Sequence, residues 1–143
     1  MPRRAAQVVF VGLLVVPFAF LAVAVAKQWA GGAPELRAVL FWIAIAVSAF
    51  DIALSRVLPG RIPLSRTGPE ATAFARLSLA WALCEAAILF PLVAYIMTGD
   101  GRLLGVFALD VIALLTLWPS DARWKAALPP APGQAPPAQR MVR

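Results

Sequence analysis

The sequence lacks histidine, has a single cysteine and contains few charged residues, and each shortage excludes a class of protein. Without histidine there is no imidazole to bind a metal or a haem, or to act as a general base. The one cysteine, Cys84, cannot form a disulfide within the chain. Neither a glycine-rich phosphate loop nor a paired nucleophile and base is present. We therefore predict no enzyme, no cofactor and no metal site.

Apolar sequence, by contrast, is abundant. Of the 143 residues, 62% are hydrophobic and only 14% are charged, whereas a soluble domain carries about 25% charged residues. The length leaves room for one domain. The net charge of +6 could indicate nucleic-acid binding, but the charges cluster at the ends of apolar runs, as they do in membrane proteins. We therefore expect an integral membrane protein whose partner is the lipid bilayer and not nucleic acid.

Four apolar runs are candidates for transmembrane α-helices. They cover residues 8–26, 38–55, 77–97 and 103–118. A bilayer core of about 30 Å needs roughly 20 helical residues, and backbone in lipid must satisfy its own hydrogen bonds. The fourth run would span only about 24 Å, so it must lie upright or thin the bilayer locally. The first run is longer than a signal-peptide core, and we expect it to be retained as a helix.

The connections predict how the four helices are joined. Glycine-rich turns at residues 31–34 and 99–101 indicate two antiparallel hairpins. In the connection before the third helix, Thr67 and Glu70 form a candidate capping box that would start the helix near Gly68. The predicted fold is thus an all-α transmembrane domain over residues 1–128. Ser120 is expected to cap a short interfacial helix within that domain.

Residues 129–143 are rich in proline and alanine and are predicted to be a disordered tail.

The distribution of basic residues predicts the orientation of the helices in the membrane. With four spans, ten basic residues lie on the side of both termini and three on the other side. The positive-inside rule then places both termini in the cytoplasm. We expect a multi-pass protein of the cytoplasmic membrane, with the tail in the cytoplasm.

Three carboxylates lie inside the apolar runs, namely Asp51, Glu85 and Asp110. An ionisable group in hydrocarbon costs roughly 2.5–3.5 kcal/mol on insertion scales, so it usually has a partner or a function. Residue counts place the three acids at graded depths in the inner and middle membrane. They are therefore our candidates for ion or proton binding, with Glu85 as the leading one.

Serines accompany two of these acids at helical spacing. Ser48 and Ser55 share a face of the second helix with Asp51, and Ser78 shares a face of the third helix with Glu85. Such polar faces should point at protein or water, because lipid cannot solvate them. Each acid could instead be a structural group that is hydrogen-bonded to a neighbouring helix.

Small residues form stripes that allow close helix packing. On the third helix the stripe consists of Ala80, Cys84, Ala87 and Pro91, and on the second helix of Ala46, Ala49 and Ala53. Because the whole chain is rich in alanine, the stripes do not indicate a specific dimer.

The segment 76–93 resembles the carboxylate helix of the proteolipid subunits of rotary ATPases. In that resemblance Glu85 matches the glutamate that carries protons opposite an arginine of the stator. The chain departs from the family in having Pro91 where a glycine is usual, and in lacking the glycine-rich inner helix. As a whole, the sequence also resembles small four-span bacterial membrane proteins, which implies no activity.

Two functions follow as hypotheses. The first is an accessory or structural subunit of a homo- or hetero-oligomer, because so small a bundle has little interior in which to shelter three acids. The alternative is a proton- or cation-conducting channel or carrier that uses the three carboxylates. Transport predicts a polar path that joins the acids, whereas the accessory role predicts separate acids, each capped by one neighbour.

Overall fold

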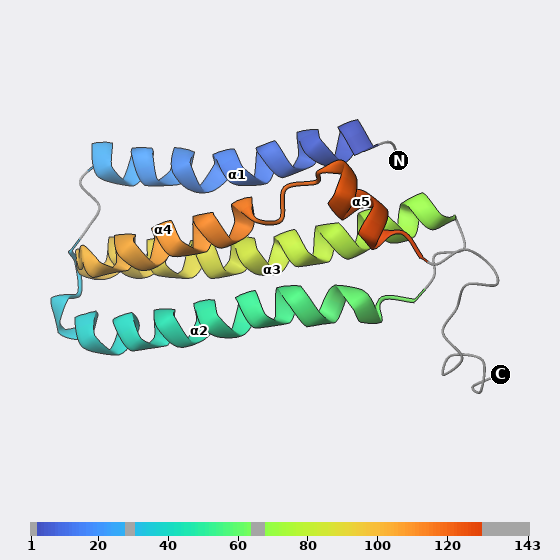
Figure 1. Cartoon of the computed structure of the whole chain (residues 1–143). Helices are drawn as coiled ribbons and strands as arrows, with labels where there is room; N and C mark the ends of the chain where they lie inside the picture. Colours follow the sequence, from blue (N-terminus) through green and yellow to red (C-terminus); the bar gives the residue numbers. More distant parts are fainter. Residues whose placement is uncertain (1–2, 28–30, 64–67, 130–143) are drawn as a thin grey trace.

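The computed structural model describes residues 3–27, 31–63 and 68–129, and within these ranges the protein is helical without any strand (Figure 1). The expected all-α class is therefore confirmed. The α-helices are α1 Arg3–Ala26, α2 Arg37–Val57, α3 Pro69–Thr98, α4 Arg102–Leu115 and α5 Asp121–Ala127. The short 3₁₀ helices η1 Pro34–Leu36 and η2 Leu58–Arg61 flank α2.

In the described part of the chain, three helical segments are long and apolar enough to cross a membrane. They are Arg3–Ala26, Pro34–Arg61 and Pro69–Thr98, and they contain the first three predicted spans. Their outer faces expose large apolar side chains, among them Val8 at 72%, Trp42 at 67% and Phe50 at 64%. An exposed apolar surface of this kind suits contact with lipid and not with water. These three helices support the classification as a membrane protein.

The fourth predicted span corresponds to α4, which is shorter than expected. It has 14 residues and a length of about 21 Å, so it does not reach across a bilayer core by itself. The helix ends in tight turns, in which Leu117 N–H donates to the Leu114 carbonyl and Trp118 N–H to the Leu115 carbonyl. Pro119 follows and has no N–H with which to continue the helix.

The helices form a bundle that is centred on α3. Figure 1 shows α1 to α4 side by side, with α1 and α3 running in one direction and α2 and α4 in the other. The main packing pairs are α2 with α3, α3 with α4, α1 with α3, and α2 with α4. Since α1 packs mainly on α3, the division into two hairpins stays a prediction.

Glycine and proline set the ends of α3. Gly68 precedes the helix with a φ of 114°, and Pro69 occupies its first turn, where the missing N–H costs nothing. Gly99 ends the helix in the left-handed conformation, with a φ of 66°, and its N–H donates to the carbonyl of Tyr95. The expected start near Gly68 is confirmed. Thr67, the proposed cap, lies outside the described residues.

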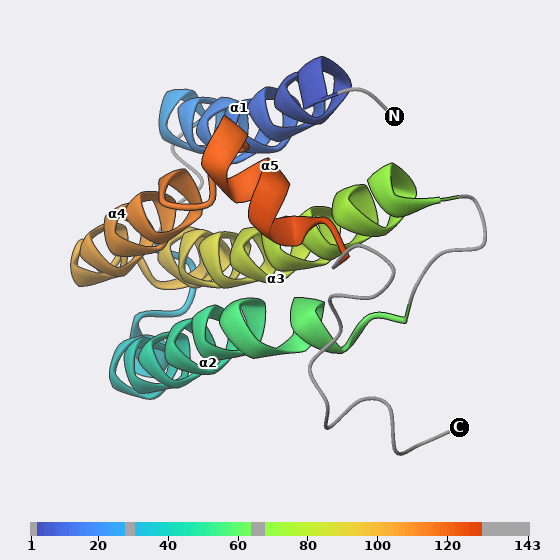
Figure 2. The same ribbon diagram turned by 45° about the vertical axis from the view of Figure 1, so that its right-hand side comes forward.

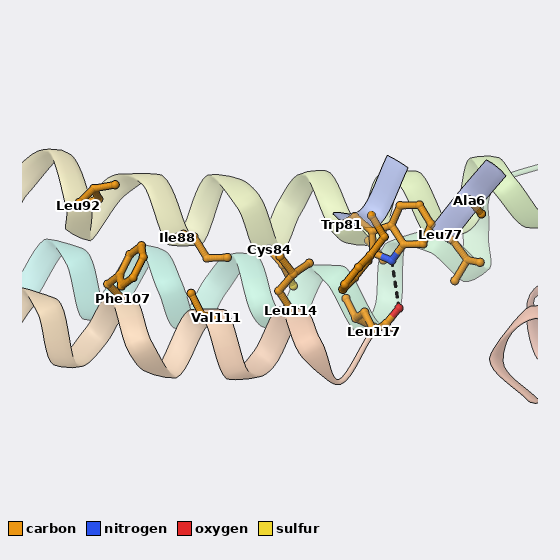
Figure 3. Packing of buried hydrophobic residues seen from close by; sticks show 12 residues of the cluster. Ala6, Leu77, Trp81, Cys84, Ile88, Leu92, Phe107, Val111, Leu114 and Leu117 are labelled. Carbon is orange, nitrogen blue, oxygen red and sulfur yellow. Dashed lines mark hydrogen bonds between the residues drawn. The ribbon is translucent and has the colours of Figure 1, made fainter. Parts of the chain in front are cut away.

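The largest buried cluster joins α1, α3 and α4 around Trp81 (Figure 3). The Trp81 and Phe10 side chains are both fully buried, and their rings meet edge to face at 5.4 Å. Trp81 Nε1 donates a hydrogen bond of 3.1 Å to the carbonyl of Leu117. That carbonyl lies where α4 ends, so the contact also ties the link between α4 and α5 to α3.

The short helix α5 closes one end of the bundle (Figure 2). Ser120 caps it by accepting a hydrogen bond from the Arg123 N–H, as the sequence predicts. Trp124 packs partly buried against the core cluster, and Arg3 at the start of α1 pairs with Asp121. The predicted disordered tail, residues 129–143, lies beyond the described residues from position 130 on.

Candidate functional site

One predicted acid, Asp110 of α4, lies in a buried hydrogen bond. Its side chain is 2% exposed, and Ser48 of α2 donates to its Oδ2 at 2.7 Å. Ser48 is itself buried, with 5% exposure. The sequence places these two residues 62 positions apart, and only the packing of α2 on α4 brings them together. A carboxyl group at this position is satisfied by the neighbouring helix, as a structural role requires.

Asp51 lies close to this pair but is not bonded to it. It is half-buried on α2, near enough to Asp110 for the two carboxyl groups to influence each other electrostatically. Among the described residues it forms no hydrogen bond or ion pair. Ser55 donates to the carbonyl of Ile52 at 2.7 Å, one turn back on its own helix. Cys84 of α3 lies within electrostatic range of both acids.

Glu85, the leading candidate from the sequence, lies apart from the other two acids. It is half-buried on α3, and within the described part of the chain no side chain bonds to it. Ser78 lies seven residues earlier on the same edge of α3, and its hydroxyl is buried without a hydrogen-bond partner in the structure. The two polar groups therefore mark an edge of α3 that the described residues leave unsatisfied. We refer to it as the Ser78–Glu85 edge.

An apolar groove runs over the Ser48–Asp110 pair, between α2 and α4. Its volume is about 520 Å³, and its walls include Phe41, Ile45 and Leu109. Gly105 of α4 also lines it, where a Cβ atom would meet no neighbour within 4 Å. Asp110 and Ser48 thus line a groove whose other walls are mainly apolar, with Arg102 as the one basic residue.

A polar network closes the end of the bundle opposite α5. Arg102 binds Asp100 through several hydrogen bonds, the shortest 2.7 Å, and its guanidinium lies 4.5 Å from the centre of the Phe41 ring. Arg37 Nε donates to the carbonyl of Thr98 at 3.0 Å. The Arg102 guanidinium holds the pKa of Asp100 below its usual range. These contacts fix the turn between α3 and α4.

Sequence reasoning missed a basic pocket at the α5 end. Its volume is about 260 Å³, and three arginines line it: Arg56 of α2, Arg76 of α3 and Arg123 of α5. The sequence indicated only that these residues lie on the same side of the membrane. Since they come from three helices, no spacing along the chain could have shown that they converge.

Comparison with known proteins and a search for metal-binding side chains both leave the function of the site unidentified. No protein-family model, curated protein or solved structure matches the chain. In the part of the chain that the structure describes, no three histidine, cysteine or acidic side chains gather closely enough to hold a metal ion. The function must therefore be argued from the polar groups inside the bundle.

Proposed function

We propose that the protein is a small polytopic membrane protein that acts as an accessory or structural subunit of a homo- or hetero-oligomer. The proposal rests on the surroundings of Glu85. It lies about midway along α3, half-buried, and no described residue bonds to it. A carboxyl group inside a membrane-spanning helix is costly unless a partner satisfies it.

Ser78 is a second polar group on the same edge of α3. The Ser78 hydroxyl is buried without a partner, and it lies about 10 Å from Glu85 along the helix axis. A helix from another subunit that packs along this edge could supply a hydrogen bond to the half-buried Glu85, whereas the Ser78 hydroxyl is already enclosed by the fold. Interhelical hydrogen bonds of this kind contribute about 0.6 kcal/mol each on average, and they select the face at which helices meet.

The state of Asp110 also favours an accessory role over transport. Ser48 already donates a hydrogen bond to it, and the groove that reaches it is lined mainly by apolar side chains, with Arg102 as its one basic residue. A transport path would need polar groups that join Asp110 to Glu85, and the described residues between them supply the apolar core around Cys84 and Ile88. Asp110 thus resembles a separate site with its own neighbour, whereas Asp51 and Glu85 have no bonded partner among the described residues.

Conduction of protons or cations remains the alternative, and one observation favours it. Asp51 lies within electrostatic range of Asp110, so two of the three candidate acids lie near each other in the bundle. Proton flux through the purified protein in liposomes distinguishes the two proposals. Flux that Asp110→Asn abolishes would establish transport, whereas liposomes without flux would exclude it.

The proposed topology has four spans with both termini in the cytoplasm of the cell membrane. The alternating helix directions in Figure 1 are compatible with this arrangement, and the excess of basic residues at the end with both termini gives the orientation. Because α4 is short, the bilayer would have to thin around it. Reporter fusions at Arg143 should read cytoplasmic, and fusions at Asp100 should read external. A periplasmic reading at Arg143 would contradict the orientation.

The experiment that tests the accessory role is a comparison of variants on the Ser78–Glu85 edge. We expect Glu85→Leu to reduce the native assembly of the protein extracted in mild detergent, because leucine cannot form the intersubunit hydrogen bond. Glu85→Gln should retain the assembly, since the amide keeps the shape and can still be hydrogen-bonded. Native mass spectrometry measures the assembly and identifies its members.

The matched control is Ala86→Leu. Ala86 is the next residue along α3 and is exposed, so the substitution adds the same side chain outside the Ser78–Glu85 edge. It should leave the assembly intact. A wild-type protein that is monomeric in its native extract, or equal assembly in Glu85→Leu and wild type, would contradict the accessory role.

A further inference from the structure

The basic pocket at the α5 end is a site that neither proposed function uses. Three arginines meet in about 260 Å³, and none of the described residues that line the pocket is acidic. Like charges that converge in a small space repel one another unless an anion enters between them. A pocket lined by three arginines and by no acidic residue favours an anion over a cation.

Two of the arginines are held in place by the fold. Arg76 donates to the carbonyls of Ala127 at 3.2 Å and Ile62 at 3.4 Å. Arg56 donates to the Thr116 hydroxyl at 2.6 Å. Because their guanidinium groups are already positioned, an arriving anion need not order them, which lowers the entropic cost of binding.

Donors on two of the arginines have no partner among the described residues. Arg76 Nε is buried and has no hydrogen-bond partner in the structure. The Arg123 side chain makes no hydrogen bond to any described residue. A buried N–H without a partner is costly, and the oxygens of a phosphate group are acceptors that match the planar donor set of arginine.

We propose that this pocket binds the phosphate of an anionic phospholipid headgroup. The walls below the arginines are apolar and include Leu77, Ala80 and Leu117, which suits the glycerol and upper acyl region of a lipid. The pocket is lined in part by α5, and Trp124 of that helix packs against the core. Figure 2 shows α5 lying across the bundle near the start of α3. Basic pockets between transmembrane helices at this level bind lipid headgroups in other membrane proteins.

The volume agrees with this occupant. Pockets for drug-sized ligands measure roughly 300–1,000 Å³, and this one is slightly smaller. It suits a headgroup and the start of its acyl chains. An inorganic phosphate shares the recognised chemistry, so the experiment must distinguish a lipid phosphate from a soluble one.

The test uses the full chain in an uncharged detergent. Native mass spectrometry compares the binding of phosphatidylglycerol with that of phosphatidylcholine, both with the same acyl chains. We expect phosphatidylglycerol to bind preferentially, because the choline group of the other lipid neutralises its phosphate. Equal binding of the two lipids would overturn the proposal.

Arg123→Gln is the diagnostic variant and Lys125→Gln its matched control. Both remove one positive charge from α5, but only Arg123 lines the pocket. Loss of one such charge should weaken phosphatidylglycerol binding about fivefold in Arg123→Gln and leave it nearly unchanged in Lys125→Gln. Since the Arg123 side chain is not hydrogen-bonded to the fold, the lipid-free variant should keep the wild-type tryptophan fluorescence. Equal binding by the two variants would contradict the site.

A competition arm identifies the source of the phosphate. Millimolar inorganic phosphate or glycerol 3-phosphate should not displace phosphatidylglycerol, because neither fills the apolar part of the pocket. Complete displacement by either compound would show that the pocket binds a soluble anion, and it would overturn the lipid assignment.

Discussion

The helices α1 and α3 are both long and apolar, yet they occupy opposite positions in the bundle. In the most apolar 18-residue window of each helix, 44% of residues are buried in α3 but only 17% in α1. Small residues on α3, including Ala80, Cys84 and Ala87, are fully or almost fully buried and let neighbouring helices approach. On α1 the branched and aromatic side chains point mainly outward. Hydropathy identifies a helix that can enter a membrane, while side-chain size decides which helix lies at the centre.

The largest effect should come from the central helix at Trp81. Trp81→Ala removes a fully buried ring and the hydrogen bond to Leu117, and we expect it to lower the free energy of unfolding by about 4 kcal/mol. The control is Trp42→Ala, because Trp42 is 67% exposed on α2 and should cost less than about 0.5 kcal/mol. Reversible unfolding in mixed detergent measures both. Equal losses would mean that α3 is not the centre of the fold.

The next effect concerns the one well-buried aromatic contact of α1. Phe10 packs edge to face against Trp81 and also against Trp118, at 5.3 Å between ring centres. Phe10→Ala should destabilise the protein by about 3 kcal/mol and loosen α1 from α3. Phe20→Ala, on the same helix but 40% exposed, should have little effect. Similar losses for the two variants would show that α1 is held along its whole length.

A smaller effect is expected from the polar contact between α2 and α4. Ser48→Ala removes the hydrogen bond to Asp110 and should cost about 0.6–1.7 kcal/mol of unfolding free energy. Ser78→Ala removes a buried hydroxyl that has no partner in the structure, so it should not destabilise the isolated protein. A silent Ser48→Ala would show that Asp110 finds another partner.

The smallest effect should appear only in acid, at the turn between α3 and α4. Arg102 lowers the pKa of Asp100 in the folded state, so the carboxylate contributes stability above its ordinary pKa of about 3.9. That contribution disappears as the pH falls through the lower pKa of the folded protein. Asp100→Asn should therefore be less stable than wild type at neutral pH, and the difference should vanish in strong acid. Thermal unfolding from pH 7 downward measures it, and a constant difference would contradict the ion pair.

Several elements could be predicted because their signals are local. The apolar runs at 8–26, 38–55 and 77–97 lie within helices that are long and apolar enough to span a membrane. Gly68 and Ser120 mark helix starts through backbone conformation and capping, which depend on a few neighbouring residues. The end of α4 was predicted too late, at residue 118 instead of Leu115, because apolar residues continue through the turns at Leu117 and Trp118.

For the candidate sites, too, the sequence predicted the local features but not the contacts between helices. The sequence alone determined that Asp51, Glu85 and Asp110 lie in apolar helices, since this needs only composition and periodicity. It could not tell the buried alanine stripe on α3 from the exposed one on α2 at Ala46 and Ala49. Which polar groups are satisfied was decided by tertiary structure, because hydrogen bonds and charges act over a few ångströms across helices. Packing alone pairs Ser48 with Asp110, leaves Glu85 open at the edge of α3, and brings three arginines into one pocket.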